Sequence, residues 1–190
     1  MPNYVVRAIR FKCVDESGID WTGSDEPYWV FSAVDDKGTA LATNKSKVFG
    51  DTDSNETKRF PTPGAKRGDN IIFPDRGVGS GGPGPIALSI QVWDKDQGDP
   101  EKTAQATNAA LVAAGLFPPT KWVAAVGAVV RQDLINLIAD DIMGSRTILF
   151  TQSRLDDTLK EKGEFFEQIF RFSGNSVTYL SVLAAVPTTI

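Results

Sequence analysis

Eight short segments rich in β-branched and aromatic residues recur along this chain, and Gly, Pro, Asn or Asp separates each segment from the next. They span residues 4–13, 27–34, 40–49, 57–60, 86–93, 146–151, 165–172 and 176–186. In the fifth segment, Leu88 and Ile90 alternate with Ser89 and Gln91, which places apolar side chains on one face of a strand. One-sided patterns of this kind are typical of antiparallel sheets. The chain is therefore predicted to be all-β, with an eight-stranded antiparallel β-sandwich as its frame.

The first segment shows the same alternation. Val5, Ile9, Phe11 and Cys13 share one face of the predicted strand, and basic residues occupy the other face. Because Cys13 lies on the apolar face, we expect it to be a buried core thiol.

A single domain over residues 1–190 is expected, with a helical-hairpin insertion at 99–140. The stretches 100–116 and 120–139 have helical patterns, and two consecutive prolines separate them. Asp99, followed by Pro and Glu, is typical of a residue that caps the start of a helix. The full prediction is a β-sandwich plus an α-helical hairpin.

The composition narrows the possible chemistry. The chain has no histidine, and its net charge is −4. Without histidine, Ser–His and Cys–His nucleophile pairs and most zinc sites are excluded, so we do not expect an enzyme. The acidic balance argues against a nucleic-acid partner. The sequence shows neither a signal peptide nor a transmembrane segment, which predicts a soluble chain, cytoplasmic or released without a leader, and leaves peripheral membrane association open.

Most acidic connections fall at one end of the predicted sandwich, and the exceptions are the short turn at 35–36 and the pair at 156–157. If successive strands run up and down, the connections 14–26, 50–56 and 94–145 all lie at the end that the first strand reaches. Asp94, Asp96 and Asp141 then stand on the two sides of one connection, because a strand runs into Asp94 and another follows Asp141. Converging carboxylates repel one another unless a cation lies among them, and an all-oxygen cluster suits a hard cation such as calcium (Ca2+).

Three short motifs resemble a known family. Residues 23–28 read Gly-Ser-Asp-Glu-Pro-Tyr, residues 92–96 read Val-Trp-Asp-Lys-Asp, and residues 141–144 read Asp-Ile-Met-Gly before an apolar strand. In this order, on an eight-stranded sandwich, they resemble a C2 domain (calcium- and phospholipid-binding) of bacterial type, with the hairpin inserted in the third loop. Glu26 and the hairpin depart from the family's pattern.

The resemblance implies a calcium site that bridges the protein to phospholipid headgroups, or a descendant of that design that binds a partner. Carried over by position, the ligands would be Asp15, Asp25, Asp94, Asp96 and Asp141. The loop 50–56 also alternates oxygen-bearing residues, so Asp51 and Asp53 are candidates for a second cation site. The alternative reading of each acidic loop is a solvated turn, because Asp and Gly favour turns without any metal.

The tip of the predicted hairpin carries Leu116, Phe117 and Trp122. One reading packs the hairpin against the sandwich or against itself. A second places the tip in a membrane interface, where the aromatic residues anchor at headgroup depth. A third has the hairpin bind a partner protein or a second copy. The sequence thus predicts a calcium-binding, membrane-engaging module, with a calcium-stabilised structural or interaction domain as the alternative.

Overall fold

The computed structural model describes residues 3–15, 25–35, 39–60, 71–76, 86–95, 98–114, 141–162, 166–174 and 177–188. Within these residues the chain forms nine strands and two helices. In chain order they are β1 (Asn3–Asp15), β2 (Pro27–Val34), β3 (Ala40–Lys45), β4 (Thr57–Arg59), β5 (Ile71–Arg76), β6 (Ile86–Asp94), α1 (Pro100–Ala114), β7 (Asp141–Phe150), α3 (Gln152–Lys162), β8 (Phe166–Gly174) and β9 (Val177–Thr188).

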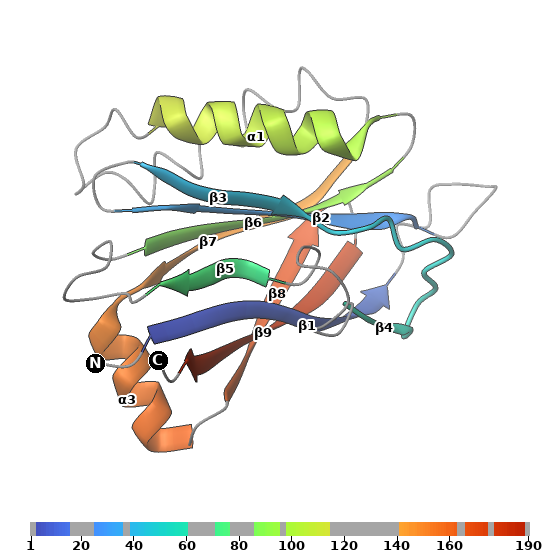
Figure 1. Cartoon of the computed structure of the whole chain (residues 1–190). Coiled ribbons are helices and arrows are strands. Elements are labelled where there is room, and N and C mark those ends of the chain that lie inside the picture. The colour runs from blue at the N-terminus through green and yellow to red at the C-terminus, as the bar shows by residue number, and fades with distance from the viewer. Residues whose placement is uncertain are drawn as a thin grey trace.

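The strands form two sheets that face each other (Figure 1). The β1 sheet has the order β4-β1-β9-β8, with β5 also paired to β1, and the β2 sheet has the order β3-β2-β6-β7. Every strand pairing in both sheets is antiparallel. The prediction of a mostly β chain with two antiparallel sheets is therefore confirmed.

The strand β5 is one more than the eight that the sequence predicts, and it lies between the predicted segments 57–60 and 86–93, where we expected no strand. Pro74 stands inside it, and such a residue is tolerated in an edge strand. Both β4 and β5 pair antiparallel with β1, β4 at Arg10–Lys12 and β5 at Tyr4–Arg7. They therefore run in the same direction along one edge, as two pieces of a single strand. Because β5 runs in the same direction as β4, the extra strand does not change the end of the sandwich at which each later connection lies.

A bulge in β1 changes the face that meets the core. Opposite β9, Ala8 pairs with Leu183 and Arg10 pairs with Val182, so Ile9 is the extra residue. Before the bulge, Val6 and Ala8 are buried, and after it Phe11 and Cys13 are buried. The prediction that Ile9 shares the core face is wrong, and Ile9 is only half-buried. The prediction of a buried Cys13 thiol is confirmed.

Aromatic side chains fill much of the space between the sheets. Phe11 of β1 packs edge-on against Phe49, with ring centroids 4.9 Å apart. Trp29 of β2 meets Phe172 of β8 nearly at right angles, at 5.2 Å. Such pairs stabilise a core beyond the area they bury. This aromatic cluster ties the two sheets together.

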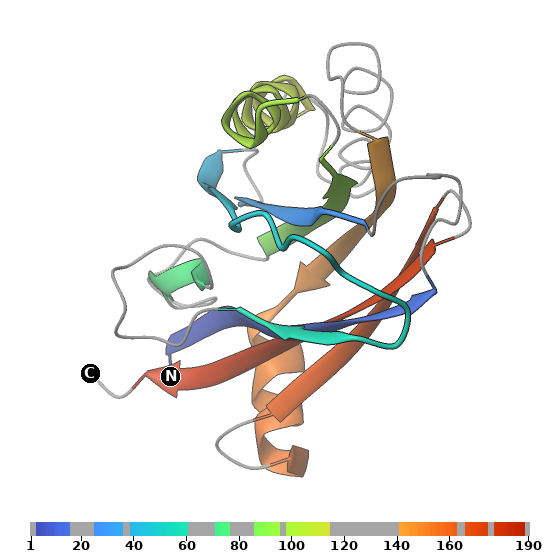
Figure 2. The same ribbon diagram turned by 90° about the vertical axis from the view of Figure 1, so that its right-hand side faces the viewer.

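The helix α1 covers the other face of the β2 sheet (Figures 1 and 2). The strand β6 is consequently buried on both faces, whereas the sequence predicts one solvated face. The predicted N-cap is confirmed, because the Asp99 carboxylate accepts a hydrogen bond from the Glu101 N–H at 3.0 Å. The predicted second helix, 120–139, lies outside the described residues.

The helix α3 lies between the predicted segments 146–151 and 165–172, where the sequence analysis predicts no helix. Thr151 caps its start by accepting the Arg154 N–H at 3.2 Å, and Leu155 is buried in the core. A short helix with so few apolar residues among charged ones has too weak a pattern to predict it. None of the helices in the described ranges has the length and apolar character of a membrane span.

Candidate cation-binding end of the sandwich

The ends of three strands of the β2 sheet meet at one level. Asp94, the last residue of β6, stands opposite Asp141, the first residue of β7. On its other side Asp94 stands opposite Pro27, the first residue of β2. The predicted approach of Asp94 and Asp141 is thus present in the backbone, although these residues are 47 positions apart in the numbering. The side chain of Asp141 is outside the described part of the structure.

The Asp94 carboxylate holds the segment before β2 in place. Its Oδ1 atom accepts a hydrogen bond from the Glu26 N–H at 2.7 Å. The Lys95 N–H in turn donates to the Glu26 carbonyl at 3.2 Å. A carboxylate is a strong acceptor for a backbone amide, so this pair fixes Glu26 against the end of β6.

Asp25 connects this strand end to a second loop. It forms an isolated antiparallel bridge with Thr52, whose N–H donates to the Asp25 carbonyl at 3.0 Å. Both residues are buried. The Thr52 hydroxyl also donates to the Phe49 carbonyl at 3.2 Å, and this hydrogen bond fixes the start of loop 50–56. Thr52 is a positioning residue that the sequence patterns did not reveal, because an isolated bridge has no periodic signal.

The loop 50–56 is held by its own hydrogen bonds. The Asp53 N–H donates to the Glu56 carboxylate at 3.2 Å, and the Glu56 N–H donates to the Asp53 carbonyl at 3.0 Å. Asp51 and Asn55 have positive φ angles of 46° and 70°, in the left-handed region that Asn and Asp tolerate. Asp51 and Asp53 are both exposed. This arrangement is that of a stable turn that presents two carboxylates to solvent.

Lys58 neutralises one acidic residue of the same loop. Its ammonium lies 2.6 Å from the Glu56 carboxylate. The hydrogen bond from Lys58 is the main cause that lowers the pKa of Glu56 below its ordinary value of 4.5. The Glu56 carboxylate is therefore already paired with the Lys58 ammonium.

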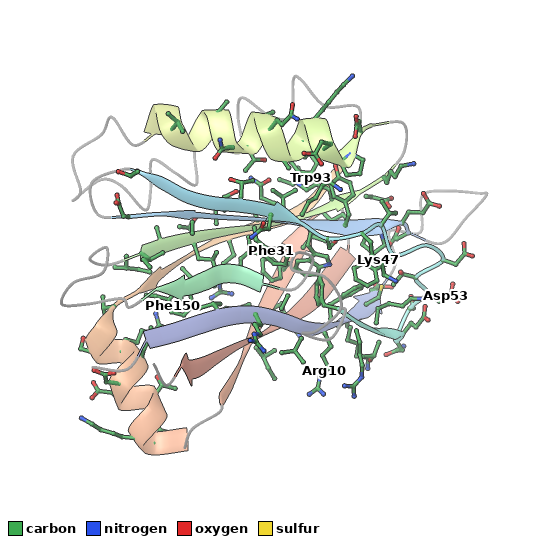
Figure 3. All side chains as sticks on the ribbon, viewed as in Figure 1. Arg10, Phe31, Lys47, Asp53, Trp93 and Phe150 are labelled. Atoms are coloured by element: carbon green, nitrogen blue, oxygen red, sulfur yellow. The ribbon has the colours of Figure 1, made fainter. Side chains whose placement is uncertain are left out.

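The same loop also contacts the end of β1. The Asn55 N–H donates to the Cys13 carbonyl at 2.8 Å, and the Cys13 N–H donates to the Glu56 carbonyl at 3.0 Å. Asp15, two residues beyond Cys13, is the exposed last residue of β1. We call this whole region the acidic end, and it comprises Asp15, Asp25, loop 50–56, Asp94 and Asp141. Figure 3 shows Asp53 at this end of the molecule.

The structure therefore places six of the seven predicted cation ligands at one end, by their backbone positions. The seventh, Asp96, is outside the described residues, as are the predicted contact residues Leu116, Phe117 and Trp122. Within the described ranges, no three side chains of Asp, Glu, His or Cys lie close enough together to hold a metal ion. The donors present are all oxygens, which suits calcium, but the described side chains do not form a complete cage.

Comparison with solved structures gives weak likenesses. A C2 domain of plant extended synaptotagmin 1 matches with 12% identity and a TM-score of 0.41, over all of this chain and 97% of that one. A structure described as a C2 domain matches with 10% identity and a TM-score of 0.41, over 98% of this chain and 99% of that chain. Human GIVD cytosolic phospholipase A2 matches with 14% identity and a TM-score of 0.41. The match covers 98% of this chain but only 16% of the phospholipase. No protein-family model and no curated protein sequence matches this chain.

Proposed function

We propose that the acidic end binds calcium and that the chain is a C2-like module that uses this end to engage a phospholipid membrane. The observation that carries this proposal is the position of Asp94. It lies between the starts of β2 and β7, with Asp141 opposite it and Glu26 bonded to it. Acidic segments far apart in the sequence therefore meet at one set of strand ends.

The residues that would hold calcium are Asp94, Asp141, Asp25, Asp15 and Asp96. One oxygen of the Asp94 carboxylate accepts the Glu26 N–H, and the second oxygen belongs to the same fixed group. The Asp25–Thr52 bridge brings loop 50–56 to the same end, where Asp51 and Asp53 would form a second cation site. Bound calcium would neutralise the acidic end and offer coordination positions to lipid phosphate.

The membrane part of the proposal involves the hairpin tip. Leu116, Phe117 and Trp122 would enter the interface beside the calcium site, because aromatic and aliphatic side chains anchor at that depth. The module would act by binding alone, without catalysis, since the chain has no histidine to serve as a general base.

A second candidate function is a calcium-stabilised structural or interaction domain, whose hairpin binds a partner protein or self-associates. The observation that favours it is the set of contacts that the acidic end already makes. Asp94 is bonded to Glu26, and Glu56 is paired with Lys58. Because these contacts already hold the acidic end together, bound calcium would add stability there without any lipid ligand.

The deciding experiment measures calcium binding and vesicle binding on the same samples. Isothermal calorimetry with calcium comes first, followed by co-sedimentation with phosphatidylserine vesicles in calcium or EDTA. Asp94→Asn keeps an acceptor for Glu26 but removes a charge, so we expect weaker calcium binding and loss of calcium-dependent sedimentation. Asp157→Asn, in an exposed position on α3, is the matched control. Calcium binding without sedimentation would favour the second function, and no calcium binding would overturn both.

A further inference from the structure

The outer face of the β1 sheet carries a cluster of cations. Arg10 of β1 and Arg59 of β4 stand directly opposite each other. Lys12 stands opposite Leu180 of β9, and Leu180 stands opposite Arg171 of β8. Residues opposite one another in a sheet share a face, and this face is not the core face, because Phe11 between Arg10 and Lys12 is fully buried. We call Arg10, Lys12, Arg59 and Arg171 the cationic face.

The cationic face is accessible. Arg59 and Arg171 are exposed, and Arg10 and Lys12 are partly exposed. Figure 3 shows Arg10 directed away from the sandwich, on the side opposite α1. Ile169, in the same register row as Arg10 across β9, is 67% exposed. Arg10 and Arg59 place two like charges opposite each other, so this face attracts an anionic group.

The acidic end lies next to the cationic face on the same strand. Asp15 stands three residues after Lys12 in β1. Cys13, which lies between them, is hydrogen-bonded to loop 50–56. The exposed carboxylates of Asp15 and Asp53 are thus neighbours of the cationic face. Adjacent patches of opposite sign permit a twofold arrangement, in which each patch of one copy meets the opposite patch of the other.

We propose that the cationic face binds the acidic end of a second copy of this chain, in a symmetric, charge-paired dimer. The charges explain why a second copy fits: each molecule carries both halves of the interface, and one twofold contact neutralises two clusters at once. Exposed ion pairs are individually weak, so the dimer is expected to dissociate readily and to be salt-sensitive. Ile169 would contribute an apolar contact at the edge of the interface.

The test is a charge exchange measured by sedimentation equilibrium, in EDTA so that calcium plays no part. The first variant combines Arg10→Glu and Arg59→Glu, and the second combines Asp15→Lys and Asp53→Lys. Each alone places like charges across both contacts, and dimerisation is expected to weaken at least tenfold. An equimolar mixture of the two restores opposite charges at both contacts, so it is expected to form a one-to-one complex. The wild-type dimer is expected at about 0.02 M salt and to be lost at about 0.5 M.

Lys102→Glu combined with Lys160→Glu changes the same number of charges at exposed positions on α1 and α3, and is expected to dimerise like the wild type. Circular dichroism melting checks that every variant is folded. A wild type that stays monomeric at low salt and high concentration would overturn the proposal. So would a mixture of the two variants that does not associate. Dimerisation that survives Arg10→Glu and Arg59→Glu, together with loss of anionic-vesicle binding in EDTA, would assign the face to lipid instead. Because calcium is absent, the result is independent of the proposed calcium function.

Discussion

The Asp94 carboxylate accepts the backbone N–H of Glu26 at 2.7 Å, across the boundary between the end of β6 and the start of β2. This contact joins two acidic segments 68 residues apart. The Asp94 carboxylate therefore stabilises the fold at this end even when no cation is bound. The fold constrains the side chain at this position independently of any ligand.

Replacing Asp94 separates these two tasks. Asp94→Ala removes the acceptor for the Glu26 N–H, and the expected loss of stability is about 1.5 to 3 kcal/mol, because the acceptor is charged. Asp94→Asn keeps an acceptor and is expected to stay close to the wild type in EDTA. Urea unfolding without calcium measures both. Equal stability of the Ala and Asn variants would show that the hydrogen bond contributes nothing.

Calcium is expected to raise the melting temperature. A ligand that binds only the folded state, at one hundred times its dissociation constant, contributes about 2.7 kcal/mol. For a chain of this size that corresponds to a rise of about 5 to 10 °C. Scanning calorimetry in EDTA and then in millimolar calcium measures the shift. Magnesium is the control ion, because its smaller, octahedral coordination sphere suits this kind of site poorly. No shift with calcium would contradict the cation site.

Much of the fold can be predicted from the sequence where burial imposes a strict period. The strand β2 begins and ends where its apolar run does, at Pro27 and Val34. Prediction failed where one residue breaks the period, as Ile9 does in the β1 bulge. The prediction of one solvated face also failed for β6. The second face of β6 is buried because α1 packs on the sheet, and this tertiary contact leaves no pattern in the β6 sequence.

The candidate site was predictable in outline only. Strand direction alone places Asp94 opposite Asp141, since one strand ends and its antiparallel neighbour begins there. No sequence pattern, by contrast, indicates that Thr52 bridges Asp25 or that Asp94 bonds the Glu26 amide. These contacts join loops through single hydrogen bonds, and a single contact between distant loops produces no periodic pattern in the sequence.

The ion pair of loop 50–56 predicts a pH dependence. The Lys58 hydrogen bond lowers the pKa of Glu56, so the folded state binds this proton less readily than the unfolded state. The stability that Glu56 contributes is therefore present above the ordinary carboxyl pKa and is lost as the pH falls through the lowered one. In Lys58→Met the pKa of Glu56 is expected to rise toward 4.5. Titration followed by carboxyl-carbon NMR measures it, with Lys160→Met, paired with Asp157 on α3, as the control.

The attachment of α1 to the β2 sheet gives the last prediction. The Tyr28 and Thr103 hydroxyls are hydrogen-bonded at 2.8 Å, and both residues are fully buried. Tyr28→Phe or Thr103→Val alone leaves one buried hydroxyl with one partner fewer, at a cost of about 1 to 3 kcal/mol. The double variant removes both polar groups, so its cost is expected to be less than the sum of the two single costs. Urea unfolding of all four proteins gives this coupling. Additive costs would mean that the two hydroxyls do not depend on each other, and that other contacts of α1, such as the Thr107–Gln91 hydrogen bond, attach it to the sheet.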